Sequence, residues 1–271
     1  MIKTVFENGV VYYRSLLIPC AHGFSTRIGG VSKQKHTAEL NLGIGRDDPD
    51  DVVLQNLSLF SKALGIDPKS VISAKQIHSS IVRTVDLNDC GEGYYFPTKE
   101  ACDGYVSNTK GIALGIRTAD CVPILLYSPK NDRSEAIIAA VHAGWRGTHK
   151  NIVSCAIKRM VDMGAIAKEI KAAIGPSIAA CCYEVSNEFF EAFCDSLGKD
   201  TAKKFIKPSL EKQGHFMADL QGINTYQLIS CGVKIENIDV ANLCTCCDPN
   251  EFYSHRYSGE LRGTMLSLIS L

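Results

Sequence analysis

The chain has 271 residues and 29 acidic and 29 basic side chains, so its formal net charge is zero. A chain without excess positive charge is not expected to bind nucleic acid. Its 45% hydrophobic and 21% charged residues are usual for a globular domain, and no apolar run is long enough for a membrane span. Twelve cysteines occur without an export signal, which predicts a reducing, cytoplasmic compartment.

Short strands are expected at the start of the chain. Residues 9–19 alternate weakly and contain Val-Val-Tyr-Tyr, which is typical of a strand or a hairpin arm. The segment that begins at His22 predicts another strand, which ends at Arg27. A guanidinium at that point could hold a carboxylate or phosphate through two parallel hydrogen bonds. The position fits a surface arginine in a loop at least as well.

A helix is expected next. Asp48 is a suitable N-cap, Pro49 suits the first helical position, and Gly65 would end the helix. Two extended segments follow within residues 71–85 and flank His78. We therefore expect the His78 side chain to project from the end of a sheet.

Three apolar runs in the middle of the chain predict strands that are buried on both faces. They lie at residues 112–116, 122–127 and 136–141 and are five or six residues long. Polar residues interrupt this apolar material before the second run, at Cys121, and directly after the third, at His142. Because buried polar groups cost free energy unless they are satisfied, we interpret these two positions as parts of a site.

The second half of the chain continues the alternation of helices and strands. We expect a helix from Thr148 to about residue 163, a strand at 170–175, helices near 186–197 and 221–231, and a last apolar segment at 265–271. No repeat, low-complexity tract or linker separates these elements. The simplest interpretation is one α/β domain over residues 1–271.

His78, Cys121 and His142 invite a common explanation. Each follows or joins a predicted strand, and two imidazoles with a thiolate are a suitable ligand set for zinc. Three protein ligands would leave a fourth position open, as in catalytic rather than structural sites. Bound zinc would ionise Cys121 and act as a Lewis acid. Taken singly, however, a buried cysteine or a histidine after a strand is more often a core residue.

Two other interpretations use the same side chains. In a metal-independent thiol hydrolase, Cys121 would be the nucleophile and His142 its base, with Asp120 or an asparagine orienting the histidine. A copper electron-transfer site would also use a cysteine and two histidines, but it usually adds a weak axial methionine. None of the five methionines lies near these motifs, so copper is disfavoured.

Cys244, Cys246 and Cys247 form the densest group of thiols. A closed structural zinc site usually has two C-x2-C pairs, and no second such pair complements this one. Cys181 and Cys182 are the only other candidates for ligands. We expect these thiols to be mostly buried near the rim of the site.

Trp145 and Arg146 lie in the segment HAGWRG that begins at His142. Its two glycines allow close approach of the backbone. Trp145, the single tryptophan, suits the wall of a pocket for an aromatic ligand as well as it suits the core. We assign Arg146 as a candidate substrate contact. The chain has neither G-x-G-x-x-G before a helix nor a P-loop, so the usual dinucleotide and nucleotide folds are not predicted.

Several segments together resemble one protein family. HGFSTRIGGVS, ELNLG, QIH, CDGYV, TADCVPILL, VHAGWRGT and IGPSIAACCYEV, followed by CT-x-C and FYSHR, occur in the order expected for YfiH-type proteins. These matches run from about residue 22 to residue 257. The family is often labelled multicopper polyphenol oxidase or laccase domain. It is associated with purine nucleoside phosphorolysis and adenosine deamination.

The resemblance implies an α/β fold of the α+β type, a single domain with mixed β-sheets flanked by helices. The Cys/His arrangement would be similar to that of cysteine hydrolases. It also implies that His78, Cys121 and His142 hold Zn²⁺ and act in catalysis, and that Arg27 and Asn41 contact the substrate. The tail departs from the family, since RGTM lacks the expected Gly-Arg-Met order.

The implied activity is that of a purine nucleoside phosphorylase. Its substrates would be phosphate and adenosine, inosine or S-methyl-5'-thioadenosine, with adenosine deaminase activity in addition. The alternative is a metal-independent Cys/His hydrolase, for example of cell-wall precursors. A multicopper oxidase needs many histidines, often in H-x-H pairs, whereas this chain has seven and no two are separated by one residue. Polyphenol oxidase activity is therefore disfavoured.

Overall fold

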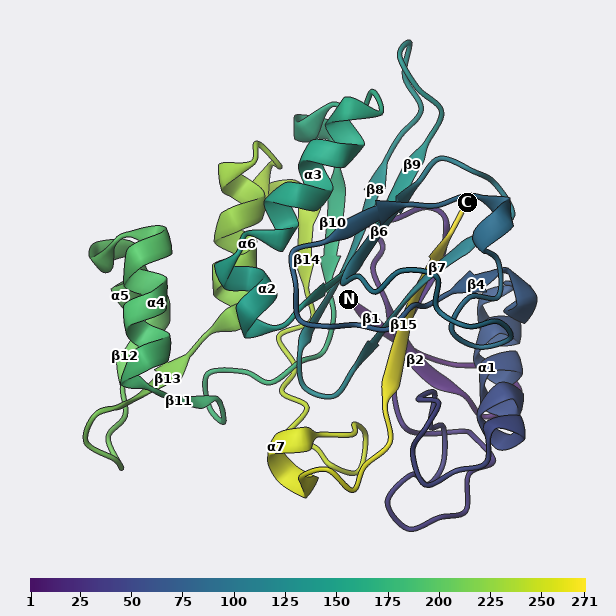
Figure 1. Ribbon diagram of the computed structural model, residues 1–271, viewed down its shortest axis with the longest axis horizontal. Helices are drawn as coiled ribbons and strands as arrows, with labels where there is room; N and C mark the ends of the chain where they lie inside the picture. Colours follow the sequence, from purple (N-terminus) through teal and green to yellow (C-terminus); the bar gives the residue numbers. More distant parts are fainter.

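Two six-stranded sheets pack face to face in the computed structural model, which describes residues 1–271. Figure 1 shows the layers from left to right as α3 and α6, the sheet with β8 and β9, the sheet with β7 and β15, and α1. Both sheets contain parallel and antiparallel pairs. The expected α/β domain with mixed sheets flanked by helices is confirmed.

The first sheet has the order β1-β2-β3-β15-β7-β4. Its neighbouring strands are antiparallel except for β4 and β7. The last strand of the sequence, β15, thus lies between two much earlier strands. The strands are β1 (Ile2–Val5), β2 (Val11–Arg14), β3 (Ala21–Ser25), β4 (Val71–Ile72), β7 (Ala113–Thr118) and β15 (Met265–Ser270).

The second sheet has the order β14-β10-β8-β9-β6-β5 and carries the site. Its central pair, β8 and β9, is antiparallel, and Pro123 lies opposite His142. Cys121, directly before β8, and His142, near the end of β9, therefore come to the same edge. The strands are β5 (Val82–Thr84), β6 (Gly104–Ser107), β8 (Val122–Ser128), β9 (Ile137–Ala143), β10 (Lys171–Ile174) and β14 (Ile238–Val240).

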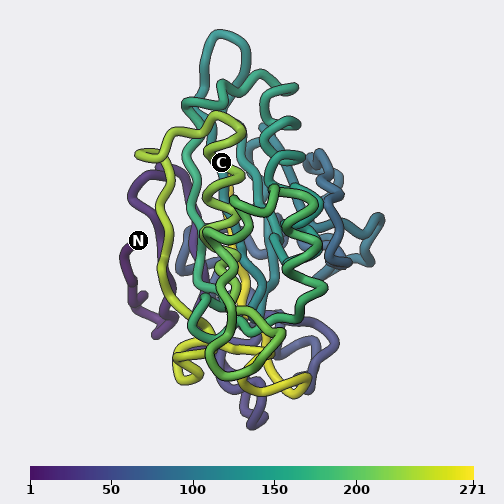
Figure 2. The backbone as a smooth tube through the Cα atoms, turned by 90° about the vertical axis from the view of Figure 1, so that its left-hand side faces the viewer, coloured from purple at the N-terminus to yellow at the C-terminus, as the bar shows by residue number.

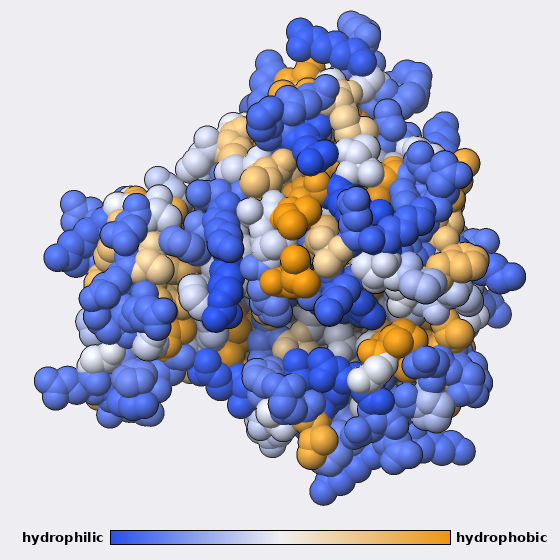
Figure 3. Space-filling view, viewed as in Figure 1, coloured by the Kyte–Doolittle hydropathy of each residue, from blue (hydrophilic) through white to orange (hydrophobic).

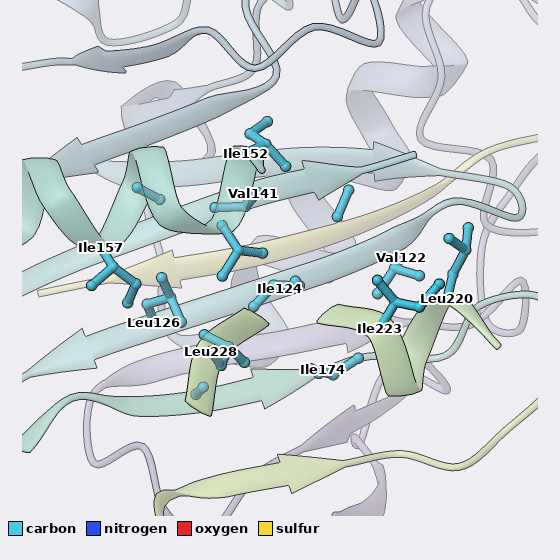
Figure 4. Packing of buried hydrophobic residues seen from close by; sticks show 14 of the residues in the cluster. Val122, Ile124, Leu126, Val141, Ile152, Ile157, Ile174, Leu220, Ile223 and Leu228 are labelled. Carbon is cyan, nitrogen blue, oxygen red and sulfur yellow. The ribbon is translucent and has the colours of Figure 1, made fainter. Parts of the chain in front are cut away.

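Apolar side chains cover both faces of each sheet. One buried cluster lies between the sheets and includes Phe24, Ile116 and Leu125. A second cluster joins α3 and α6 to the outer face of the second sheet, and Figure 4 shows their side chains meeting those of the strands. The helix α1 covers the other outer face. These layers explain why the central strands are apolar at successive positions, since neither face of them meets water.

The structure has seven α-helices. They are α1 (Asp50–Leu64), α2 (Trp145–His149), α3 (Ile152–Asp162), α4 (Asn187–Leu197), α5 (Lys199–Phe205), α6 (Leu220–Ser230) and α7 (His255–Ser258). Short 3₁₀ turns lie at Pro68–Ser70, Leu87–Asp89, Ala167–Glu169 and Ile235–Asn237. A membrane-crossing helix would have to be longer and more apolar than any of these.

Two helix predictions require correction. The helix expected after Thr148 is divided, because Asn151 has a φ of 57° and separates α2 from α3. Pro49 rather than Asp48 occupies the N-cap of α1, and the Asp48 carboxylate instead accepts a hydrogen bond of 2.8 Å from Asn41. Gly65 ends α1 with a φ of 70°, as expected.

An arm of short elements extends from the second sheet. It contains α4, α5 and a third sheet of β11 (Glu184–Ser186), β13 (His215–Ala218) and β12 (Ile206–Pro208), in that spatial order. The arm lies at the left of Figure 1, and Figure 2 brings its green helices toward the viewer. The face in Figure 3 is mostly hydrophilic, with some apolar side chains gathered near its middle.

Candidate active site

Three strand ends meet at one edge of the second sheet. The strands β6 and β8 begin at this edge and β9 ends there, because β9 is antiparallel to both. Asp103 directly precedes β6, and Cys121 directly precedes β8. His142 was expected just after a strand, but β9 continues through it to Ala143.

The structure brings His78, Cys121 and His142 together, and we call these residues the His/Cys trio. One nitrogen of each histidine and the cysteine Sγ all lie within 4.8 Å of one another. The Sγ of Cys121 is 3.9 Å from Nε2 of His78. Gly144 makes this approach possible, because a Cβ at that residue would lie 2.9 Å from Cδ2 of His78 and 3.0 Å from the Cys121 Sγ.

Asp103 organises the trio, although it was not among the predicted site residues. Its buried carboxylate accepts a hydrogen bond of 2.8 Å from Nδ1 of His142. It also accepts hydrogen bonds from the backbone N–H groups of Ile77, His78 and Ser79 and from the Ser79 hydroxyl. The first bond fixes the ring of His142 and leaves its Nε2 for Cys121.

The same carboxylate holds the loop that carries His78. This histidine has a φ of 57°, a conformation that few residues other than glycine adopt. The hydrogen bonds that residues 77–79 donate to Asp103 hold the loop in this conformation. One feature of the sequence could have indicated this role: Asp103, in the segment CDGYV, lies directly before a buried strand.

Asp120 does not orient a histidine, so that part of the hydrolase interpretation is wrong. Its Oδ1 accepts a hydrogen bond of 2.6 Å from the Thr245 hydroxyl. Its Oδ2 accepts one of 2.7 Å from the backbone N–H of Arg256. Both carboxylate oxygens therefore join the loop before β8 to the C-terminal segment, and Asp103 orients His142 instead.

The buried groups of the site set one another's charge. Burial alone would raise the pKa of Cys121, but the charges and hydrogen bonds of His142 and His78 lower it to about 6. Burial lowers the pKa of His142, but Cys121 and Asp103 raise it to about 9. Burial likewise would raise the pKa of Asp103, whereas hydrogen bonds from His142 and Ser79 lower it to about 2. The protein alone thus favours a thiolate beside an imidazolium, and a metal ion could replace the proton of that imidazolium.

One of two pockets beside the trio is rich in cations, and we call it the basic pocket. It has a volume of about 430 Å³. Its charged lining consists of Arg46, Lys75, Arg117 and Arg262, and no carboxylate takes part. Gln76 and Thr118 add polar groups. These cations are far apart in the sequence and were not among the predicted site residues.

The second pocket, which we call the aromatic pocket, has a volume of about 300 Å³. It is lined by Trp145, Ile178, Tyr183, Leu220, His255 and Arg256 and by the carboxylates of Asp120 and Glu260. The trio members His78 and Cys121 line both pockets, and so does Arg262. The Nε of Arg262 is a buried donor without a hydrogen-bond partner in the protein, which is unusual for such a group.

The other predicted site residues lie outside both pockets. Arg27 donates to the carbonyl oxygens of Ala38 and Pro249 and lies over the Tyr253 ring. Asn41 is buried, and its side chain binds Asp48 and the backbone N–H groups of Gly43 and Thr264. Arg146 is exposed and lies 4.4 Å from the Trp145 ring. The structure does not bring these three residues to the trio, and as substrate contacts they stay predictions.

Comparison with known proteins now decides the family. The family model described as "Multi-copper polyphenol oxidoreductase laccase" matches residues 21–271. The chain belongs to this family. A family relative, the purine nucleoside phosphorylase YlmD of Bacillus subtilis, is 33% identical over 258 residues, which cover 92% of this chain and 87% of YlmD.

Two further relatives support the assignment. The adenosine deaminase RL5 of an unknown prokaryotic organism is 33% identical over 240 residues, which cover 87% of this chain and 88% of RL5. The crystal structure of the Bacillus licheniformis hypothetical protein YfiH matches with a TM-score of 0.89 at 28% identity. That match covers 99% of this chain and 98% of YfiH. The resemblance to YfiH-type proteins is confirmed.

Proposed function

We propose that this protein is a zinc-dependent purine nucleoside phosphorylase. Its nucleosides would be adenosine, inosine and S-methyl-5'-thioadenosine, and it would also deaminate adenosine. The observation that carries the proposal is the pair of pockets that meet at the His/Cys trio, one lined by cations and the other by aromatic rings. Phosphorolysis needs two unlike substrates in one site, the phosphate anion and a nucleoside with a flat purine base. Relatives named purine nucleoside phosphorylase and adenosine deaminase support the choice.

The donor set fits a zinc ion. Nε2 of His78, Sγ of Cys121 and Nε2 of His142 would hold it, and three ligands are typical of a catalytic zinc site. The hydrogen bond that Nδ1 of His142 donates to Asp103 is the usual support for a metal-binding imidazole. The lowered pKa of Cys121 means that the thiolate costs little to form. When bound, zinc would supply a Lewis acid beside both pockets.

Arg262 would bind the phosphate together with Arg46 and Arg117. Guanidinium groups bind phosphate through pairs of parallel hydrogen bonds. Arg262 lies where the pockets meet, and its Nε has no other partner. Burial and the neighbouring charge of Arg46 lower the pKa of Arg262 from its usual value. The exposed Glu260 carboxylate, 3.9 Å from Arg46 and 3.8 Å from Arg262, offsets part of their mutual repulsion, and a phosphate dianion between the arginines would offset more of it.

The purine would lie in the aromatic pocket against Trp145 and Tyr183. Stacking of a base on an aromatic side chain is worth about 1–3 kcal/mol. Tyr183 packs edge-on against Phe189, with ring centroids 5.8 Å apart, and the guanidinium carbon of Arg256 lies 5.4 Å from the centroid of the Tyr183 ring. Trp145 also packs against Phe189, at 5.6 Å. Both rings are therefore fixed before a substrate arrives, which lowers the entropy lost on binding.

Bound in this way, the two substrates would face each other across the trio. A phosphate oxygen would form a bond to the anomeric carbon of the ribose while the bond from that carbon to the purine nitrogen breaks. The electron pair of the broken bond would stay on the purine, which takes up a proton. In the deamination, water would replace the amino group of adenosine and release ammonia.

The test combines metal content with product analysis. Untagged protein is incubated with adenosine, with and without phosphate, and the products are separated by chromatography. We expect adenine only when phosphate is present, inosine in both cases, and zinc in the purified protein. Cys121→Ala should lose about one zinc per chain and at least about a thousandfold in turnover, about 4 kcal/mol.

Cys155→Ala is the matched control, because Cys155 is a half-buried thiol of α3 outside the trio and both pockets. It should keep the zinc and the activity. If wild-type protein with zinc releases neither adenine nor inosine, the proposed function is wrong.

A metal-independent Cys121–His142 hydrolase is the second candidate. The thiolate and imidazolium that the protein alone favours are what such an enzyme uses. This candidate requires inactivation by iodoacetamide and full activity in the presence of chelators. Loss of activity with a chelator, restored by zinc, would exclude it.

A further inference from the structure

Four cysteines from two distant segments gather beside the aromatic pocket, and we call them the four-cysteine cluster. Cys181 and Cys182 come from the loop after β10, and Cys244 and Cys247 from the loop after β14. All four Sγ atoms lie within 4.8 Å of one another. The Sγ of Cys247 is 3.4 Å from each of the sulfurs of Cys181 and Cys182.

The fold explains how these thiols meet. β10 and β14 are parallel neighbours, so the loops that follow them leave the same edge of the sheet. Beyond the strands, Ser177 and Cys244 form an isolated parallel bridge that keeps the two loops in register. The expectation of mostly buried thiols is wrong for Cys181 and Cys247, which are exposed.

We propose that the four-cysteine cluster binds a structural zinc ion, separate from the ion of the His/Cys trio. Four thiolates form the closed tetrahedral ligand set of structural zinc sites. With Zn–S bonds of about 2.3 Å, a regular tetrahedron places its sulfurs about 3.8 Å apart. The observed separations, from 3.4 Å to at most 4.8 Å, bracket this value. An iron–sulfur cluster, in which several ions lie among the thiolates, needs more space.

The loop of Cys244 is built to favour a thiolate. The backbone N–H of Ala179 donates to its Sγ at 3.4 Å. Cys244 and Cys247 form a C-x2-C pair, whereas the other two ligands are adjacent in sequence. Zinc binding would displace the thiol protons, which pass to the solvent.

A zinc ion here would brace one wall of the aromatic pocket. Tyr183, which follows Cys182 directly, and Ile178 both line that pocket. Arg256 donates to the carbonyl oxygens of Cys182 and Glu184, at 3.0 Å in each case. Cys181 and Cys247 themselves lie at the surface, so a metal ion would join the two loops where apolar packing does not. The inference does not depend on the proposed function.

Zinc counting tests this site. Untagged protein, purified under reducing conditions, should hold about two zinc ions per chain. Cys181→Ser/Cys247→Ser should lose about one and keep the zinc of the trio, whereas Cys121→Ala should lose the other. Cys155→Ser should lose none. If the trio binds no zinc, wild type should hold about one, and only the double variant should lose it.

Three results would overturn the proposal. They are unchanged zinc in the double variant, iron in place of zinc, and a disulfide between Cys181 or Cys182 and Cys247 in freshly isolated protein. Because the double variant could fail to fold, cobalt substitution in the Cys121→Ala protein provides a second measurement. We expect the intense d–d and charge-transfer bands of a four-sulfur tetrahedral site. A spectrum without thiolate ligands would also exclude the site.

Discussion

The two pockets beside the His/Cys trio differ more in chemistry than in volume. The basic pocket, of about 430 Å³, presents arginine and lysine side chains and no carboxylate. The aromatic pocket, of about 300 Å³, presents Trp145 and Tyr183 together with apolar side chains, two carboxylates and the side chains of His255 and Arg256. A site for one uniform substrate has no need of such a contrast. The difference indicates that two unlike molecules, or two unlike ends of one molecule, meet at the trio.

The two pockets predict different effects on activity when their residues are replaced. Side chains that line one pocket should affect one substrate, whereas residues that position the trio should affect every reaction of the site. Three substitutions test this division, and we take them in order of expected effect.

Arg262→Met should have the largest effect. It removes a guanidinium that lies where the pockets meet and has an unpartnered Nε. We expect kcat/KM for phosphorolysis to fall about 10²- to 10³-fold, the usual loss for one preorganised donor. Initial rates at several phosphate concentrations measure this. Adenosine deamination, which needs no phosphate, should fall less.

The control for this change is Arg159→Met, an exposed arginine of α3 outside both pockets, which should keep full activity. Equal losses of phosphorolysis and deamination in Arg262→Met would show that Arg262 acts on the trio rather than on phosphate.

Asp103→Asn should weaken both reactions to the same extent. Asparagine keeps the size of the side chain, but its NH₂ group would face the N–H donors that now bind the carboxylate. Loss of such a supporting bond usually lowers metal affinity or activity about 10- to 100-fold. Competition with a zinc chelator, together with both turnover assays, measures it. Unchanged zinc affinity would contradict the role given to Asp103, and Asp162→Asn, at an exposed site on α3, is the control.

Tyr183→Leu should have the smallest effect and should act on one substrate only. Loss of a stacking ring should raise KM for the nucleoside about tenfold, or about 1.4 kcal/mol. KM for phosphate should not change, because Tyr183 does not line the basic pocket. Tyr257→Leu, at an exposed position, should change neither value. A matching rise in KM for phosphate would mean that the two pockets are not independent.

The trio could be predicted because its chemistry is visible along the chain. Cys121 and His142 interrupt apolar strands, and the pairing of β8 with β9 alone brings them to one edge. His78 was predicted from its place between two extended segments, and the family motifs point to the same residue. The ends of the helices could not be predicted as well. Asn151 divides one predicted helix although it is neither proline nor glycine.

The rest of the site depends on contacts between distant segments. Asp103 acts because the loop of residues 77–79 wraps around its carboxylate, which no spacing reveals. Arg262 reaches the trio only after the C-terminal segment has folded across the sheet edge. The four-cysteine cluster does not show the usual two C-x2-C pairs in the sequence, because Cys181 and Cys182 are adjacent. Strands of three residues, such as β11 and β12, are too short to show a period.

The place of β15 between β3 and β7 governs when this protein can become active during its synthesis. A nascent chain that lacks residues 265–270 leaves β3 and β7 without a common neighbour, so the first sheet stays in two parts. Arg262 and Thr264, which line the basic pocket, directly precede β15, so the insertion of β15 also brings Thr264 to its hydrogen-bond partners Asn41 and Leu42. The basic pocket should therefore be complete, and the proposed phosphorolysis should begin, only after β15 has left the ribosome and inserted between β3 and β7.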